Sequence, residues 1–243
     1  MPINLKKLQA IARRRLKLKD PVEWKKVSKS QLKSQGLGSE YLSTRSNINK
    51  HVISYSDASS LEAFDVFHEM CKAKLNELGF NRIEAAALDA MRDCGKDDPK
   101  YIRDANSAAA IVLETLANSN LFSLFPEESR TQRERMVLRF ESTDALTTLH
   151  TQMGFWGTAG VSYYLAASNR SGTPFPQDLV EKAIVRASDG QEIRKEYDVI
   201  NSLLDELPKI NPSLELLANE DSLKIVDVMY DCSPQRSVGH NYS

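Results

Sequence analysis

Residues 61–78 read LEAFDVFHEMCKAKLNEL and predict a long amphipathic helix. Apolar side chains recur along it at spacings of three and four residues, which places them on one helical face: Leu61, Phe64, Phe67, Cys71, Leu75 and Leu78. Ser59 or Ser60 can cap the N-terminus of this helix, and Gly79 follows its end, where a glycine commonly stops a helix. The segment therefore predicts a helix that buries one face in a core.

Helical patterns dominate the rest of the chain. Residues 52–56 (VISYS) are the best candidate for a strand, because the run is short, rich in β-forming residues and followed by turn residues. Further helices are predicted over residues 4–19, 82–92, 101–121, 129–140, 144–152, 161–167, 177–186, 191–207 and 214–219. The sequence therefore predicts a mainly α fold (α+β with at most a small sheet near residue 53).

The first 50 residues differ from the rest in charge. They hold 13 Lys/Arg and 3 Asp/Glu, whereas the remainder of the chain is acidic and brings the net charge to −1. Residues 4–19 predict a helix with one apolar and one basic face, and Ser, Gly and Asn accumulate over residues 28–49. We therefore divide the chain into a basic helical arm and linker, residues 1–49, and a mainly helical domain, residues 50–243.

Composition favours an ordinary globular protein. Hydrophobic residues make up 41% and charged residues 27% of the 243 positions. Three scattered cysteines do not form a disulfide scaffold and favour a reducing compartment. No apolar run is long enough for a transmembrane segment, and no secretory signal is evident, so we expect a cytoplasmic (intracellular) protein.

A histidine and a glutamate stand side by side on the predicted helix, at His68 and Glu69. In zinc peptidases an H-E-x-x-H helix places two imidazoles one turn apart on the metal. Here Lys72 occupies the second histidine position. A later predicted helix carries Glu114 and, four residues on, Asn118. With these two motifs, residues 50–130 resemble the gluzincin branch of zinc peptidases, which has H-E-x-x-H on one helix and E-x-x-x-D on another.

The resemblance implies a zincin-like helical core with defined roles for its residues. His68 would be the first metal ligand, Glu69 the general base, and Glu114 the third ligand. Asn118 would stand where an aspartate orients a ligating histidine. The sequence departs from this pattern at Lys72 and at Asn118, so two positions of the same site have lost their ligand chemistry.

Lys72 decides which chemistry remains open. A protonated lysine has no lone pair and cannot bind zinc. Its ammonium can instead stand where the metal would lie, which predicts a metal-free site. If the site does bind a metal, the resemblance implies zinc, so the expected cofactor is none or Zn. Cys71 could replace the missing ligand, although it also fits the apolar stripe. Further along, His150 could stabilise an oxyanion, as could Tyr163 or Tyr164, although all three also suit a core or loop.

These residues predict a degenerate zincin-like protein, catalytically weak or inactive, with a binding or regulatory role. If it is active, the reaction is zinc-dependent peptide hydrolysis with Glu69 as base. The alternative is a helical interaction module whose basic arm, residues 1–26, binds nucleic acid or a protein partner. An ordinary helix, with Glu69 and Lys72 forming a solvated pair, also fits the pattern. His51 has no metal-like neighbour in the sequence.

Overall fold

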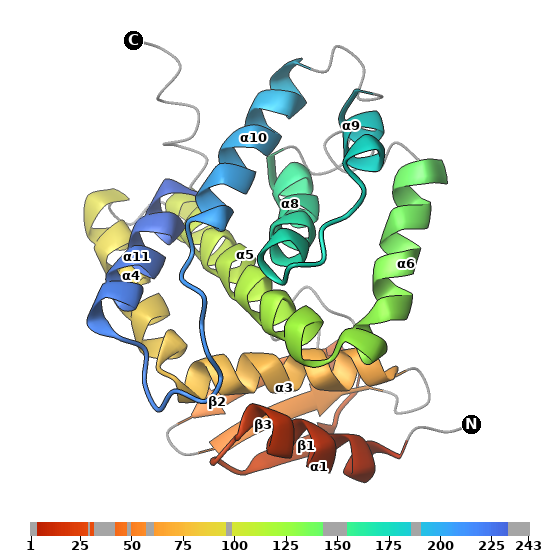
Figure 1. The fold of residues 1–243 in the computed structure, drawn as a ribbon. Coiled ribbons are helices and arrows are strands. Elements are labelled where there is room, and N and C mark those ends of the chain that lie inside the picture. The colour runs from red at the N-terminus through yellow and green to blue at the C-terminus, as the bar shows by residue number, and fades with distance from the viewer. Residues whose placement is uncertain are drawn as a thin grey trace.

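A small sheet and a set of helices form the part of the chain that the computed structural model describes (Figure 1). The described residues are 4–28, 30–31, 42–47, 50–56, 61–95, 99–142, 155–185 and 191–232. The elements in chain order are α1 (Leu5–Leu16), β1 (Val22–Lys26), β2 (Leu42–Asn47), β3 (Lys50–Tyr55), α3 (Ala63–Glu77), α4 (Phe80–Gly95), α5 (Pro99–Leu124), α6 (Pro126–Ser142), α8 (Phe155–Arg170), α9 (Gln177–Val185), α10 (Gln191–Asp205) and α11 (Asn219–Asp231). The predicted mainly α fold with a small sheet is confirmed.

The sheet has three strands in the order β1-β3-β2. β1 runs parallel to β3, with Trp24 opposite Ile53, and β2 runs antiparallel to β3. The expected strand near residue 53 is thus the central one. The prediction of a linker over residues 28–49 was wrong for β2, whose polar sequence LSTRSN lacks a β-branched pattern. β1 was also missed.

The basic N-terminal helix is packed against the body of the protein. α1 contacts α3, and its Ala12 and Leu16 side chains are fully buried. β1 pairs with β3, so segments on both sides of residue 50 share one sheet and one core. The apolar stripe of α1 is thus covered by the body of the protein, and the division of the chain into residues 1–49 and 50–243 stays a prediction.

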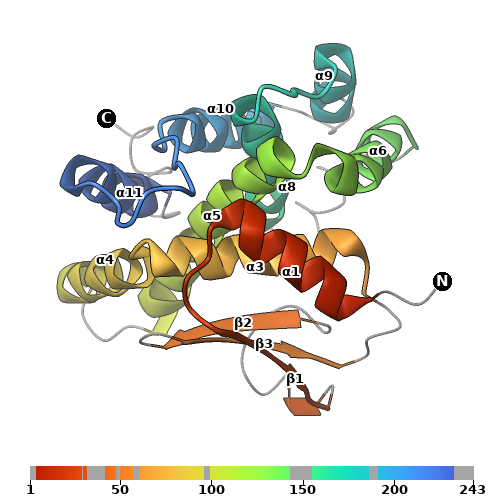
Figure 2. The ribbon, with the colours of Figure 1, turned by 60° about the horizontal axis from the view of Figure 1, so that its bottom comes forward.

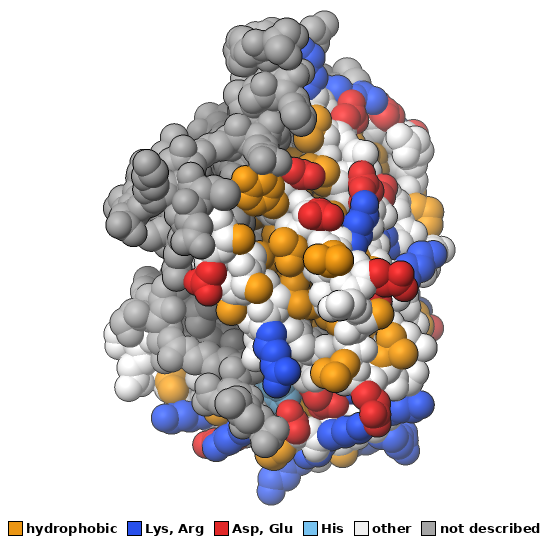
Figure 3. All heavy atoms as spheres, turned by 90° about the vertical axis from the view of Figure 1, so that its left-hand side faces the viewer, with side chains coloured by type: hydrophobic (Ala, Val, Ile, Leu, Met, Phe, Trp, Pro, Cys, Tyr) orange, Lys and Arg blue, Asp and Glu red, His pale blue; other side chains and the backbone are white. Residues whose placement is uncertain are grey.

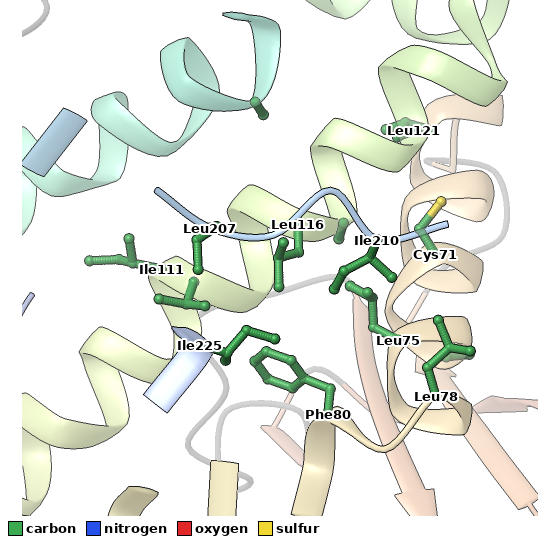
Figure 4. Close-up of a cluster of buried hydrophobic side chains, with 14 of the residues drawn as sticks. Cys71, Leu75, Leu78, Phe80, Ile111, Leu116, Leu121, Leu207, Ile210 and Ile225 are labelled. Carbon is green, nitrogen blue, oxygen red and sulfur yellow. The ribbon is translucent and has the colours of Figure 1, made fainter. Parts of the chain in front are cut away.

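α3 lies between the sheet and α5, with α1 beside it, and α5 runs through the middle of the helices beyond (Figures 1 and 2). The main core forms where α3, α4, α5 and α11 meet, and Figure 4 shows some of its side chains, including Leu75, Phe80, Leu116 and Ile225. On the face where α4 and α11 lie, apolar side chains also reach the surface (Figure 3). This packing of α3 on α5 fixes the relative position of two helices that carry charged residues.

The ends of α3 are set by local interactions. At its start, the Asp65 carboxylate accepts the backbone N–H of Glu62 at 2.7 Å, whereas the predicted caps Ser59 and Ser60 lie outside the described residues. At its end, Gly79 has a φ of +108°, a conformation that side-chain-bearing residues rarely adopt. The predicted stop at Gly79 is therefore confirmed.

Two of the predicted helices, over residues 214–219 and 144–152, are not found in the described structure. The helix expected over residues 214–219 was wrong: residues 214–218 are irregular with a bend, and α11 begins only at Asn219, with Glu220 and Asp221 in its first turn. The helix expected over residues 144–152 lies outside the described residues. Among the described residues, no helix combines the length and the apolar character that a bilayer span requires.

Candidate functional site

Two packed helices bring four of the predicted site residues together. His68, Glu69 and Lys72 lie on α3, and Glu114 lies on α5. Because positions four apart on a helix share a face, His68 and Lys72 both reach Glu114. We call these four residues the His68 cluster. It joins side chains that are separated by more than forty positions in the sequence.

Glu114 accepts contacts from both cationic groups of α3. Its Oε2 lies 2.9 Å from His68 Nε2, and its Oε1 lies 2.5 Å from Lys72 Nζ. Glu69 Oε1 lies 3.2 Å from Lys72 Nζ and 3.4 Å from His68 Nδ1. Lys72 therefore bridges the two carboxylates, and His68 contacts both of them as well. Each carboxylate of the cluster faces one ammonium and one imidazole.

The cluster is largely shielded from water. The side chains of Glu69, His68, Lys72 and Glu114 are 5%, 13%, 16% and 24% exposed, respectively. The His68 ring also stacks on Phe64, with centroids 5.7 Å apart and planes 12° from parallel. This stacking restrains the ring about its χ angles. The imidazole is therefore held between a hydrophobic ring and two carboxylates.

Charge pairing dominates the protonation of the cluster. Burial raises the pKa of Glu114, but His68 and Lys72 outweigh it and lower that pKa from 4.5 to about 2. Burial, the largest single effect, lowers the pKa of His68, but the Glu114 charge and the hydrogen bonds to Glu114 and Glu69 together outweigh it, so the net pKa lies above the ordinary 6.5. Burial likewise opposes the charge of Lys72, yet Glu69 and Glu114 raise its pKa. The Lys72 ammonium and the Glu114 carboxylate are thus ionised at neutral pH.

Asn118 and Cys71 do not join the cluster. Asn118 is fully buried, and its Nδ2 donates to the backbone carbonyl of Glu114 at 2.8 Å, so its amide serves its own helix. Cys71 is fully buried in the hydrophobic core near Leu75 and Ile210 (Figure 4), and burial raises the pKa of its thiol. This location argues against the alternative of Cys71 as a metal ligand. His150 lies outside the described residues.

α8 lies beside the His68 cluster and contributes two tyrosines. The rings of Tyr163 and Tyr164 have centroids 4.4 Å apart and pack at the edge of the main core. Burial and, to a lesser extent, the nearby Glu114 carboxylate raise the pKa of both phenols. They therefore stay protonated at neutral pH and present neutral hydroxyl groups near Glu114.

A second polar cluster was not foreseen from the sequence. Asp20 follows α1, His51 lies on β3, and Glu77 ends α3. One ligand atom from each lies within 4.8 Å of the others, and Lys74 forms an ion pair with Glu77. We call these four residues the His51 cluster. No spacing in the sequence could reveal it, because the pairing of β1 with β3 brings the parts together.

Comparisons with known proteins give no match. No family model matches the chain, and no curated protein or solved structure matches it either. The function is therefore inferred from the side chains of the two clusters and from their surroundings.

Proposed function

We propose that this protein has a zincin-like site that an ion pair has replaced, and that it acts by binding or regulation rather than by peptide hydrolysis. The observation that supports this most is the position of Lys72. Its ammonium lies against Glu69 and Glu114, the two carboxylates that the gluzincin resemblance assigns to general base and metal ligand. His68, the remaining ligand of that pattern, lies against Glu114. The proposal is thus that a covalently attached cation stands in the metal position.

An ammonium in this position cannot supply the chemistry of a zinc ion. Catalytic zinc lowers the pKa of a bound water to about 7 and polarises the carbonyl under attack. An ammonium offers hydrogen-bond donors and charge but no coordination site for water. Glu69 Oε1 also lies 3.2 Å from Lys72 Nζ, so its carboxylate is held in an ion pair. We therefore expect hydrolytic activity to be weak or absent.

The alternative from the sequence is an interaction module that uses the basic N-terminal helix. Lys6, Lys7 and Arg14 are exposed on α1 and support this alternative. Arg15 does not, since it donates to the Leu124 carbonyl and pairs with Glu128. Replacing the three exposed residues with glutamine tests the alternative without removing the buried face of α1. A loss of salt-dependent binding to nucleic acid would favour it over the lead proposal.

Zinc titration of a Lys72→His variant tests the lead proposal. The introduced imidazole lies one turn from His68 and faces Glu114, so the variant should acquire a zinc site that the wild-type cluster lacks. A Lys72→His/Glu114→Gln double variant is the matched control and should lose the acquired site. Isothermal titration calorimetry and elemental analysis measure both.

Two results would contradict the proposal. In the first, Lys72→His binds no more zinc than the wild type, which would mean that the cluster does not have the geometry of a metal site. In the second, the wild type hydrolyses a peptide library and Glu69→Gln abolishes that activity. That result would make the cluster a working active site.

A further inference from the structure

We propose that Asp20, His51 and Glu77 form a binding site for a divalent cation of the zinc or manganese class. This site is separate from the His68 cluster and does not depend on the function proposed for it. One imidazole nitrogen and two carboxylate oxygens lie within 4.8 Å of one another. Imidazole and carboxylate are ligands that zinc and manganese accept in proteins.

The three residues come from segments that the fold holds in place. His51 lies opposite Val22 in the parallel β1–β3 pair, and its backbone N–H donates to the carbonyl of Pro21 at 3.0 Å. Asp20 comes just before that proline. Glu77 Oε2 accepts the backbone N–H groups of Lys19 and Asp20 at 2.8 and 3.3 Å. The backbone therefore sets the separation of the three side chains.

The histidine is buried beside one of the two carboxylates. His51 is 1% exposed, and its Nε2 lies 3.8 Å from Asp20 Oδ2. Burial lowers the pKa of His51, although Asp20 and Glu77 oppose that effect. In its neutral form an imidazole has a lone pair that a cation can accept.

The negative charge of the His51 cluster is only partly balanced by its lysine. Lys74 Nζ lies 2.8 Å from Glu77 Oε1 and donates to the Lys17 carbonyl at 3.2 Å. Among the described residues it forms no ion pair with Asp20. In the His68 cluster, by contrast, Lys72 contacts both carboxylates. The two clusters have similar residues, but only the His51 cluster keeps a carboxylate that its lysine does not neutralise.

Glu77 retains coordination capacity although it already accepts hydrogen bonds. A carboxylate offers about four lone-pair positions. Glu77 uses two of them on the backbone N–H groups at Oε2 and one on Lys74 at Oε1. By this count, the hydrogen bonds of the described residues leave one lone-pair position on Oε1 unused. A bound ion would link the segment after α1, the central strand β3 and the end of α3.

Metal titration of the full chain tests the proposal. Protein stripped with a chelator is dialysed and titrated with Zn²⁺ and, separately, with Mn²⁺ by isothermal titration calorimetry. One saturable site per chain is expected, together with a rise in melting temperature as metal is added. Asp20→Asn keeps the side-chain shape at a partly exposed position and should weaken binding by about 100-fold or more, since even outer-shell changes cost about 10- to 100-fold.

His68→Gln is the matched control, because it changes the other cluster and should leave this affinity unchanged. Absence of saturable binding by both metals would overturn the proposal, as would binding that Asp20→Asn does not weaken. Binding lost in His68→Gln and kept in Asp20→Asn would place the metal in the His68 cluster. That last result would overturn both this site and the metal-free function proposed above, whereas the first two would leave that function intact.

Discussion

Replacing Lys72 with methionine should destabilise the folded protein by about 3 kcal/mol at pH 7. The variant keeps the length of the side chain and removes the ammonium that lies 3.2 Å from Glu69 and 2.5 Å from Glu114. Burial alone raises the pKa of Glu114, yet His68 and Lys72 together bring it from 4.5 to about 2, so the two cations jointly favour the ionised form by about 3 kcal/mol. Removing one member of a buried ion pair typically costs about 3–5 kcal/mol, consistent with this figure.

The sign of the pH dependence follows from the same pKa. Stability supplied by a carboxylate with a lowered pKa is present above the unfolded value of 4.5 and is lost as the pH falls towards the folded value of about 2. The cost of Lys72→Met should therefore be full at pH 7 and shrink below pH 4.5. Urea unfolding followed by far-UV circular dichroism at several pH values measures it.

An exposed ion pair supplies the matched control. Lys182 pairs with Asp178 at 3.4 Å on the surface of α9, and Lys182→Met should cost no more than about 0.5 kcal/mol. Adding Glu114→Gln to Lys72→Met should recover part of the larger cost, because the uncompensated charge is then removed. If Lys72→Met costs no more than Lys182→Met, the ammonium does not compensate the buried carboxylates and the electrostatic account of the cluster is wrong.

Three further outcomes are expected. His68→Gln should cost more stability at pH 5.5 than at pH 9, because an imidazole with a raised pKa stabilises the fold below pH 6.5 and loses that contribution as the pH rises. Urea unfolding at both pH values measures the two costs. Equal costs would contradict the raised pKa. Cys71 should resist thiol-modifying reagents until the protein unfolds, as followed by mass spectrometry of its peptide; rapid labelling of the folded chain would contradict its burial. Gly79→Ala should lower the unfolding free energy by about 1 kcal/mol through backbone strain alone, since the added Cβ would meet no atom within 4 Å. An unchanged denaturation midpoint would show that the strain is absent.

Local patterns predicted α3, its end at Gly79 and the central strand, because their signals lie within a few residues. The edge strands were not predictable in this way. β2 reads LSTRSN and lacks the alternation and the apolar run that a strand usually shows, and in β1, which reads VEWKK, the apolar–polar alternation spans only four residues. Their pairing partner, β3, supplies the hydrogen bonds and the apolar residues that stabilise them. This information is tertiary and is absent from a local window.

The two polar clusters differ in predictability for a similar reason. Helical periodicity places His68 and Lys72 on one face, and the E-x-x-x-N spacing on α5 then indicates Glu114 as their partner. The His51 cluster has no such periodicity, because its members come from a loop, a strand and a helix end. Only the parallel pairing of β1 with β3 brings Asp20 close to His51.

The last prediction concerns Asn118 and whether position 118 contributes to zinc binding at the His68 cluster. Asn118 lies one turn after Glu114 on α5, is fully buried, and donates to the Glu114 carbonyl. In the wild type, Asn118→Asp replaces that donor with a charge and should destabilise the fold by about 3 kcal/mol or more. In a Lys72→His background with zinc bound, the same carboxylate can orient a ligating imidazole, so zinc affinity should rise by about 10- to 100-fold. Calorimetric titration of the single and double variants measures this coupling. Equal zinc affinity with and without Asn118→Asp would show that position 118 does not belong to the site, and the gluzincin resemblance would then rest on His68, Glu69 and Glu114 alone.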